Sequence, residues 1–184
     1  GIPRSSLLMT VAASLFAALM AVGAYVAVPV GPVPIVLQNL FVFLAALLLP
    51  PRWAVSSVGV YLLAGALGLP VFAGGGVGLG HVAGPTGGYL VAYLPASALI
   101  AVISRAGGAR AATDAAAVLA GALCVYAVGV PWLKAVLGLD WTAALAAGML
   151  PFLVGDALKV AAAVGAARLV RPLWREFLQD TAER

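Results

Sequence analysis

Three long stretches of this sequence contain no Asp, Glu, Lys or Arg: residues 5–51, 53–104 and 115–133. An α-helix needs about 20 consecutive apolar residues to cross the hydrocarbon core of a bilayer, so these stretches have room for several crossings. The chain is 64% hydrophobic and 9% charged, which leaves too little polar surface for a soluble domain. Runs such as residues 44–49 do not alternate polar with apolar side chains, as a transmembrane β-barrel requires. Since helices satisfy their own backbone groups in lipid, the sequence predicts an all-α membrane protein.

Helix-breaking residues divide the chain into six transmembrane helices, which form a single membrane domain over residues 1–184. We place them at about residues 6–28, 35–49, 53–68, 87–104, 111–130 and 151–170. Six helices of about 20 residues use most of the chain. No room therefore remains for a soluble catalytic domain.

The connections between these segments have their own patterns. Residues 29–34 hold three prolines and a glycine, which cannot continue a helix and predict an extended loop. Residues 69–86 form a glycine-rich loop without charge. We expect a linker over residues 131–140 and a short helix near residues 141–148 before the last segment. The charged tail from Arg171 is expected to be exposed to water.

The basic residues indicate how the chain is oriented. If the N-terminus lies in the cytoplasm, every arginine falls on the cytoplasmic side: Arg4, Arg52, Arg105, Arg110, Arg168, Arg171, Arg175 and Arg184. The outer loops then keep only Lys134, His81 and Asp140. This positive-inside distribution supports an even number of crossings with both termini in the cytoplasm.

In this orientation the loop of residues 29–34, the loop of residues 69–86 and the start of the last segment meet at the outer face. Glycine-rich backbone at membrane depth is tolerated only where it is buried in protein or lines a cavity. One interpretation is a structured loop folded over a pocket, with backbone groups available to a ligand. The other is a flexible outer loop without a role. The absence of charge, together with Val71 and Phe72, favours the pocket.

Asp156 and Lys159 are the most informative polar pair, because their i,i+3 spacing puts them on one face of the last helix. Ionisable groups inside a membrane segment are costly and usually face a cavity or each other. Two interpretations stay open. The pair either neutralises itself so that the helix can insert, or it forms a polar clamp. In the clamp, Lys159 donates to a ligand carboxylate and Asp156 accepts from ligand N–H groups.

Nucleotide and metal binding have no support in the sequence. The glycines of residues 74–80 match neither the P-loop pattern nor the spacing of a dinucleotide-binding fingerprint, so energy from ATP must come from another subunit. His81 has no Cys, Asp or Glu nearby at metal-ligand spacing. We expect it to be a hydrogen-bonding residue of a pocket or loop.

Catalysis and nucleic-acid binding are also disfavoured. No Ser–His–Asp set or carboxylate pair indicates an enzyme, and no cofactor is expected. Asp114 lies at the start of a helix, where capping and the helix dipole explain it. The basic residues lie at helix ends rather than on an aromatic-interleaved surface, so they do not indicate nucleic acid.

Small residues form a ridge along the first segment at Ala13, Ala17 and Ala21. Such ridges allow helices to approach closely in membranes. The ridge either packs inside this bundle or docks to another membrane subunit, and composition favours the first.

Four motifs occur in order along the chain: Pro32-Val-Pro-Ile-Val-Leu-Gln38, Gly68-Leu-Pro-Val-Phe-Ala-Gly-Gly75, Gly84-Pro-Thr-Gly-Gly-Tyr89 and Pro151-Phe-Leu-Val-Gly-Asp-Ala-Leu-Lys159. Together they resemble BioY, the biotin-specific substrate-binding S component of energy-coupling factor (ECF) vitamin transporters. The resemblance covers nearly the whole chain.

This resemblance implies a six-helix S component with structured outward loops in a prokaryotic cell (inner) membrane. It would bind biotin from outside and associate with a transmembrane coupling (T) subunit and two ABC-type ATPases. The implied substrate-binding residues are Asp156, Lys159, Tyr89, Phe72, Gly75 and Gln38, with His81 beside the third motif. The resemblance also favours the second interpretation of the small-residue ridge, in which Ala13 and Ala17 lie at the interface with the T subunit.

Two other functions stay open. The chain could be an S component for another vitamin, which would share the architecture and bind a different solute. It could also be a self-sufficient, proton-coupled carrier that uses Asp156 as its titrating group.

Overall fold

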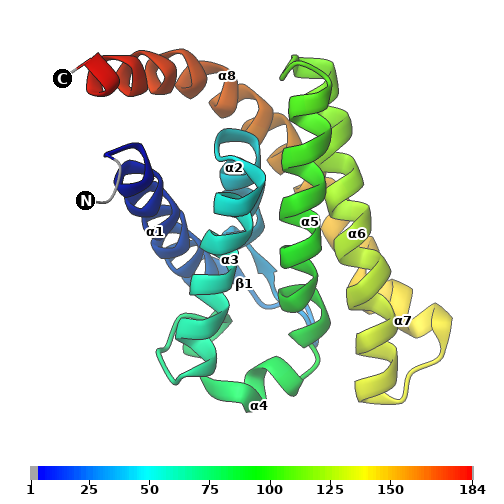
Figure 1. Cartoon of the computed structure of the whole chain (residues 1–184). Coiled ribbons are helices and arrows are strands. Elements are labelled where there is room, and N and C mark those ends of the chain that lie inside the picture. The colour runs from blue at the N-terminus through cyan, green and yellow to red at the C-terminus, as the bar shows by residue number, and fades with distance from the viewer. Residues whose placement is uncertain (1–3, 184) are drawn as a thin grey trace.

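The computed structural model describes residues 4–183, with side chains for residues 6–174 and for Glu176. Among the arginines of the predicted cytoplasmic side, Arg184 and the side chains of Arg4 and Arg175 lie outside this description. The elements in chain order (Figure 1) are α1 (Arg4–Tyr25), β1 (Ala27–Val28), β2 (Ile35–Val36), α2 (Gln38–Leu48), α3 (Pro51–Ala66), the 3-10 turn η1 (Ala73–Gly75), α4 (Gly78–Ala83), α5 (Gly87–Ala106), α6 (Ala111–Leu137), α7 (Trp141–Gly148), the 3-10 turn η2 (Leu150–Phe152) and α8 (Leu153–Glu183).

Four helical stretches are long and apolar enough to cross a membrane: Ser6–Tyr25, Gly87–Ala106, Ala111–Leu137 and Trp141–Trp174. The predicted all-α membrane architecture is therefore confirmed, whereas the count of six crossings is not. The other two helices that were predicted to cross are shorter, since α2 has 11 residues and α3 has 16. At 1.5 Å per residue they are about 16 and 24 Å long, less than the roughly 30 Å of a hydrocarbon core.

The predicted ends of the first two segments differ from the structure. The segment expected at residues 6–28 stops at Tyr25, because the chain turns into a two-stranded antiparallel hairpin. In this hairpin Ala27 pairs with Val36 and Val28 with Ile35, so the loop of residues 29–34 is its tip. The hairpin occupies residues that hydropathy assigned to helices, and α2 consequently begins only at Gln38.

Two later boundaries were also wrong. The linker expected from Pro131 is helical, because α6 continues through this proline to Leu137. Membrane helices tolerate such a proline, since neighbouring groups satisfy the carbonyl that it frees. The last segment does not end at residue 170, because α8 runs on to Glu183 with Pro172 inside it. The short helix expected near residues 141–148 is confirmed as α7.

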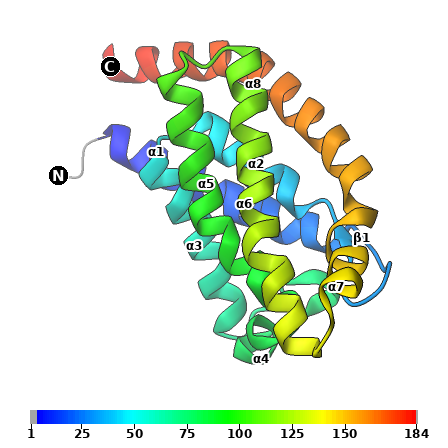
Figure 2. The same ribbon diagram turned by 90° about the vertical axis from the view of Figure 1, so that its right-hand side faces the viewer.

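Helices α5 and α6 lie side by side as an antiparallel pair, and α8 follows α6 before it changes direction (Figures 1 and 2). A proline kinks a helix in this way because it cannot donate a backbone hydrogen bond. Small residues bring the paired helices close together. A Cβ added to Gly121 of α6 would lie 2.4 Å from Cδ1 of Ile100 on α5, so a larger residue there would require the Ile100 side chain to move.

Arg171 and Asp114 form a buried ion pair, so Arg171 is not the exposed residue that was expected. Asp114 does lie in the first turn of α6, as expected, but it pairs with Arg171 as well. Arg171 donates from Nη1 to Asp114 Oδ2 at 2.5 Å and from Nη2 to Oδ1 at 3.0 Å. It also reaches Ser104 Oγ and the carbonyl oxygens of Leu47 and Ala109. Arg171 is thus not a water-exposed tail residue. Asp114 is fully buried and paired, because α8 passes over the start of α6.

The small-residue ridge of α1 faces inward. Ala13 and Ala17 are 4% and 6% exposed and belong to the hydrophobic core. These side chains are buried within the single chain, while their predicted role at an interface with the T subunit stays a prediction. Packing inside the bundle, the alternative interpretation, is what the structure shows.

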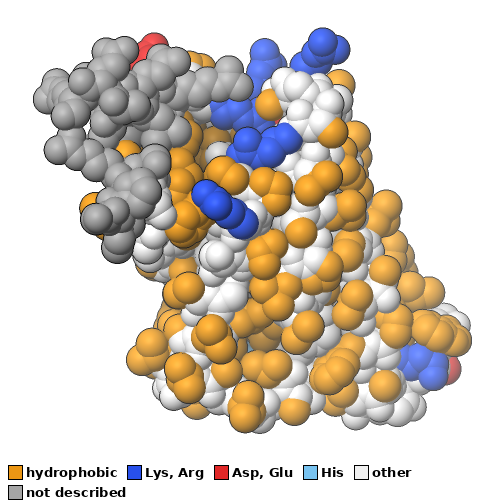
Figure 3. Space-filling model, in the orientation of Figure 1, with side chains coloured by type: hydrophobic (Ala, Val, Ile, Leu, Met, Phe, Trp, Pro, Cys, Tyr) orange, Lys and Arg blue, Asp and Glu red, His pale blue; other side chains and the backbone are white. Residues whose placement is uncertain are grey.

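Charge is concentrated at the two ends of the molecule (Figure 3). On the face shown, most Lys and Arg side chains lie toward the end that carries the α5–α6 turn. A separate basic and acidic pair lies at the opposite end beside α7, where Lys134 stacks over Trp141 and Asp140 caps the helix. Between these ends the surface is dominated by apolar side chains.

Candidate functional site

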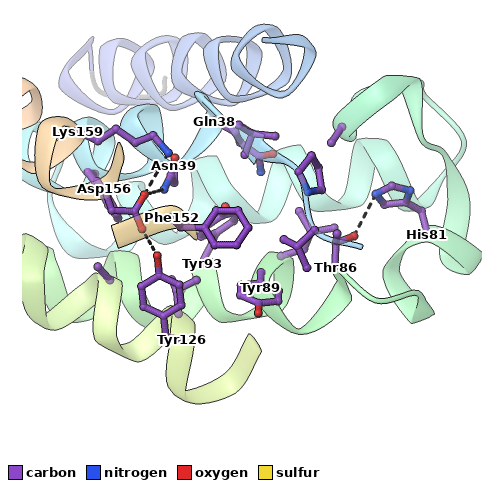
Figure 4. A pocket seen from close by; sticks show the side chains of 18 residues that line it. Gln38, Asn39, His81, Thr86, Tyr89, Tyr93, Tyr126, Phe152, Asp156 and Lys159 are labelled. Atoms are coloured by element: carbon purple, nitrogen blue, oxygen red, sulfur yellow. Dashed lines mark hydrogen bonds and ion pairs between the residues drawn. The ribbon is translucent and has the colours of Figure 1, made fainter. Parts of the chain in front are cut away.

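A cavity lies between α2, α5, α6 and the start of α8, and residues of the hairpin loop, η1 and α4 border it. Its empty space is about 680 Å³, including the open mouth. Polar side chains gather at two separate ends of the cavity, with Tyr93, Phe152 and Tyr89 between them (Figure 4). A pocket bordered by the hairpin loop and by the glycine-rich segment of residues 69–86 is therefore present, as predicted.

The first end is organised around the carboxylate of Asp156. Its Oδ1 accepts from Asn39 Nδ2 at 3.0 Å and from Lys159 Nζ at 3.1 Å, and the hydroxyl of Tyr126 donates to Oδ2. These donors come from α2, α8 and α6, so one carboxylate joins three helices. Asp156 and Lys159 are each 9% exposed. An ionised carboxylate is an acceptor only, and these donors compensate its burial.

The opposite end holds His81 and Thr86. The imidazole of His81 stacks on Phe72 with 5.0 Å between ring centroids, and its Nε2 lies 3.4 Å from Thr86 Oγ1. Gly76 makes room for the ring, because a Cβ there would lie 2.2 Å from His81 Nδ1. Burial lowers the pKa of His81 below its usual value of 6.5, so the ring is neutral at pH 7.

The walls between these ends are aromatic and aliphatic. Tyr89 presents its ring to the cavity, while its hydroxyl donates to the carbonyl oxygen of Gly148 at 2.8 Å. Gly129 allows this packing, because a Cβ there would lie 2.4 Å from Tyr89 Cδ1. A largely apolar wall with polar groups at its ends suits an elongated, amphiphilic small molecule.

Two residues of α2 that line the cavity each have a buried polar atom without a geometrically ideal hydrogen bond inside the described part of the chain. These atoms are Nε2 of Gln38 and Oδ1 of Asn39, both buried. The hydroxyl of Tyr61 lies near enough to the Gln38 side chain to accept a hydrogen bond from it. A buried polar atom without a partner costs free energy, so Oδ1 of Asn39 is the stronger candidate contact for a ligand.

The structure brings together five of the seven residues predicted to bind substrate: Gln38, His81, Tyr89, Asp156 and Lys159 line the cavity. The other two, Phe72 and Gly75, do not line it. Phe72 is fully buried behind His81, and its ring packs against Tyr61 and over Gly65. Gly75 belongs to the positive-φ backbone of η1, whose residue Ala73 faces the cavity instead.

Sequence reasoning missed four polar lining residues: Asn39, Thr86, Tyr93 and Tyr126. Asn39 directly follows the first quoted motif, and Thr86 lies inside the third, so extending those motifs would have found both. Tyr126 lies in an unbroken apolar run and gives no local signal. Its role emerges only when α6 meets α8.

This arrangement can bind a solute but offers no reactive group set. Within residues 4–183 as described, no three His, Cys, Asp or Glu side chains gather into a metal-binding group. The Asp156–Lys159 pair bears no net charge and still offers donors, because an ammonium has three N–H groups and Lys159 directs one at Asp156. The first end therefore suits a neutral group that both donates and accepts hydrogen bonds.

Comparison with known families gives a match over nearly the whole chain. Residues 4–176 match the model of the BioY family. A probable biotin transporter BioY of Pyrococcus horikoshii is 44% identical over 151 residues, which covers 82% of this chain and 88% of that protein. The biotin transporter BioY of Thermotoga maritima is 40% identical over 158 residues, covering 85% and 92% of the two chains.

Among solved structures, the fold is similar to that of a biotin S-component from an ECF-type ABC transporter, determined at 2.1 Å. The two superpose with a TM-score of 0.87 and share 28% sequence identity. The match covers 94% of this chain and 95% of the other.

Proposed function

Because the chain belongs to the BioY family, we propose that it is the biotin-capturing S component of an ECF-type uptake transporter and that the α2–α5–α6–α8 cavity is its biotin site. The family is one of transporter S components, so the protein is not an enzyme. The observation that carries the proposal is the cavity itself. It has apolar walls, a charge-compensated hydrogen-bonding end and a second polar end.

The charge at the first end determines how biotin would lie. Lys159 is already compensated by Asp156, so a ligand carboxylate bound there would leave a net negative charge in a buried site. The ureido group of biotin is neutral and offers two N–H donors and one carbonyl acceptor. We therefore assign the ureido ring to Asp156 and Lys159 together. This revises the expected division in which Lys159 takes the carboxylate.

The carboxylate would then extend to the opposite end, beside His81 and Thr86. Both side chains can donate a hydrogen bond, and Asp156 is the single acidic residue that lines the cavity among the described residues. Val125 and Phe152 belong to the apolar wall between the two ends and would contact the thiolane ring and the aliphatic chain.

Calorimetry with the purified protein in detergent tests the function. Biotin should bind tightly, with saturation well below micromolar free ligand, and riboflavin and thiamine should not compete. No heat and no saturation with micromolar biotin would contradict biotin capture. Competition by another vitamin would favour an S component of different specificity. Proton-dependent uptake by liposomes that contain this chain alone would favour a self-sufficient carrier.

The orientation of biotin can be tested with biotin amide, which lacks the anionic carboxylate. Lys159→Ala should weaken biotin and biotin amide by the same factor, because Lys159 serves the ureido end. His81→Ala should instead reduce the preference for biotin over its amide. The reverse pattern would return the carboxylate to Lys159.

The membrane arrangement follows from the same proposal. We propose that α1, α2, α3, α5, α6 and α8 make six crossings of a prokaryotic cell membrane, with both termini in the cytoplasm. Exposed apolar side chains support contact with lipid, for example Leu7, Val11 and Leu15, which are 56%, 59% and 57% exposed. Labelling of single cysteines placed in the α5–α6 turn should succeed only from the cytoplasmic side.

Transport would need further subunits. We propose that a T subunit and two ABC-type ATPases associate with the chain and supply the energy, in line with the ECF-type transporter named for the similar structure. Co-purification of the three partners with the tagged chain tests this. Biotin uptake that depends on ATP and on those partners is the expected result.

A further inference from the structure

Asn39 occupies an unusual position between the ion pair and the cavity. It is the second residue of α2. Its Nδ2 donates to Asp156 Oδ1 at 3.0 Å, while its Oδ1 is buried and makes no hydrogen bond with any described residue. Asn39 also lines the cavity. The amide nitrogen of Asn39 therefore has a partner within the protein, and the amide oxygen has none among the described residues.

The negative charge of Asp156 determines which atom of the Asn39 amide, the nitrogen or the oxygen, stays without a partner. The nitrogen and oxygen of an amide are assigned from their partners, and turning this amide around would place Oδ1 against a carboxylate that only accepts. Asp156 thus holds Nδ2 toward itself and turns Oδ1 away. The result is a preorganised acceptor next to Lys159, whose ammonium is the donor at the same end.

From this geometry we propose that Asn39 is a specificity-determining residue that accepts a hydrogen bond from one ureido N–H of the ligand. The inference rests on the proposed capture of biotin and adds a contact to it. The donor of Lys159 and the acceptor of Asn39 complement the carbonyl and the N–H of a cyclic urea. A solute without an N–H at this point leaves Asn39 Oδ1 unpaired, which excludes it more strongly than a lost contact alone would.

Two isosteric analogues of biotin can test whether Asn39 accepts a hydrogen bond from a ureido N–H. These are the cyclic carbamates in which one ring N–H or the other is replaced by oxygen. Dissociation constants for biotin and both carbamates are measured by calorimetry with the wild-type protein, Asn39→Leu, Asn39→Ala and the control Ser97→Ala. Ser97 is a buried membrane residue whose hydroxyl donates to the Leu94 carbonyl oxygen outside the cavity.

The wild-type protein should bind the carbamate that lacks the contacted N–H more weakly than biotin by about 5- to 150-fold. Asn39→Leu should abolish the preference for biotin over that analogue and leave the preference for biotin over the other carbamate unchanged. Asn39→Ala also lacks the acceptor oxygen, so it should abolish the same preference. Ser97→Ala should retain both preferences. The Ala variant decides the matter if Asn39→Leu does not fold.

The failures are distinguishable. If the wild-type protein does not bind biotin, the proposed function itself is wrong. If it binds biotin but Asn39→Leu weakens biotin and both carbamates by one common factor, Asn39 is merely structural and the inference is overturned. Retention of the preference in Asn39→Ala overturns it as well. The inference is supported if Asn39→Leu changes the ratio of the dissociation constants of biotin and one carbamate, and leaves the ratio for the other carbamate unchanged.

Discussion

Replacing Arg171 by methionine should remove a large part of the stability of this protein. The guanidinium is the bidentate partner of Asp114, whose side chain is completely buried, and its own side chain is 13% exposed. Without it Asp114 loses its bidentate cation and keeps the hydroxyl of Ser104, at 2.5 Å. Removing one partner of a buried ion pair costs about 3–5 kcal/mol, because an uncompensated charge remains. We expect a loss of that size in the free energy of unfolding.

The double variant Asp114→Leu with Arg171→Met separates the charge from the packing. Both charges are then gone, and a buried pair replaced by apolar side chains is often neutral. Arg171 also donates to the carbonyl oxygens of Leu47 and Ala109, which would lose that donor. The double variant should therefore keep a cost of about 1–3 kcal/mol, smaller than that of Arg171→Met alone.

Unfolding in one detergent, followed by intrinsic fluorescence against added denaturing detergent, measures all variants on one scale. Arg168→Met is the matched control, since Arg168 is an exposed arginine on the same helix, and it should change stability by less than about 0.5 kcal/mol. The reasoning is refuted if Arg171→Met costs no more than this control. It is also refuted if the costs of Arg171→Met and Asp114→Leu simply add in the double variant.

Three further changes test other parts of the structure. Tyr126→Phe removes the hydroxyl that donates to Asp156 and should weaken biotin by about 10-fold or more, while the protein still unfolds cooperatively. Gly87→Ala would place a Cβ 1.6 Å from a backbone carbonyl oxygen of α4, so folded protein should be lost, whereas Gly59→Ala, with nothing within 4 Å, should not reduce stability. Because burial lowers the pKa of His81, the unfolded state binds the proton more tightly, so stability should fall as the pH drops below the ordinary value of 6.5, and His81→Gln should flatten that slope in unfolding measured against pH.

Patterns of residues close together in the chain predicted the membrane helices, the family and one ion pair of this protein. Uncharged runs gave the membrane helices, and the resemblance carried by four motifs gave the family, which the comparisons confirm. The i,i+3 spacing placed Asp156 and Lys159 on one face, where they do form an ion pair. These features depend on residues a few positions apart, so the chain itself displays them.

What the sequence could not predict depends on residues far apart in the chain. From the sequence, Arg171 was assigned to the charged tail and Asp114 to the start of a helix. Each assignment was sufficient to explain the residue from its neighbours in the chain. Their pairing requires α8 to return over the start of α6, which hydropathy does not encode. Phe72 was placed in the pocket with its motif, but its ring turns behind His81 to pack over Gly65.

The polar contacts of α8 also explain how its position can be unique in a membrane protein. Lipid is as apolar as leucine, so the hydrophobic effect does little to choose between rotations of a membrane helix. A slip of one residue turns a helix by about 100°. Such a slip would take Asp156 away from Asn39 and Tyr126, and Arg171 away from Asp114, all in one step. The few buried charges of α8 therefore select one register, with Asp156 near its start and Arg171 past its middle. The contacts that would shape the ligand site are in this way the same ones that hold α8 against α2 and α6.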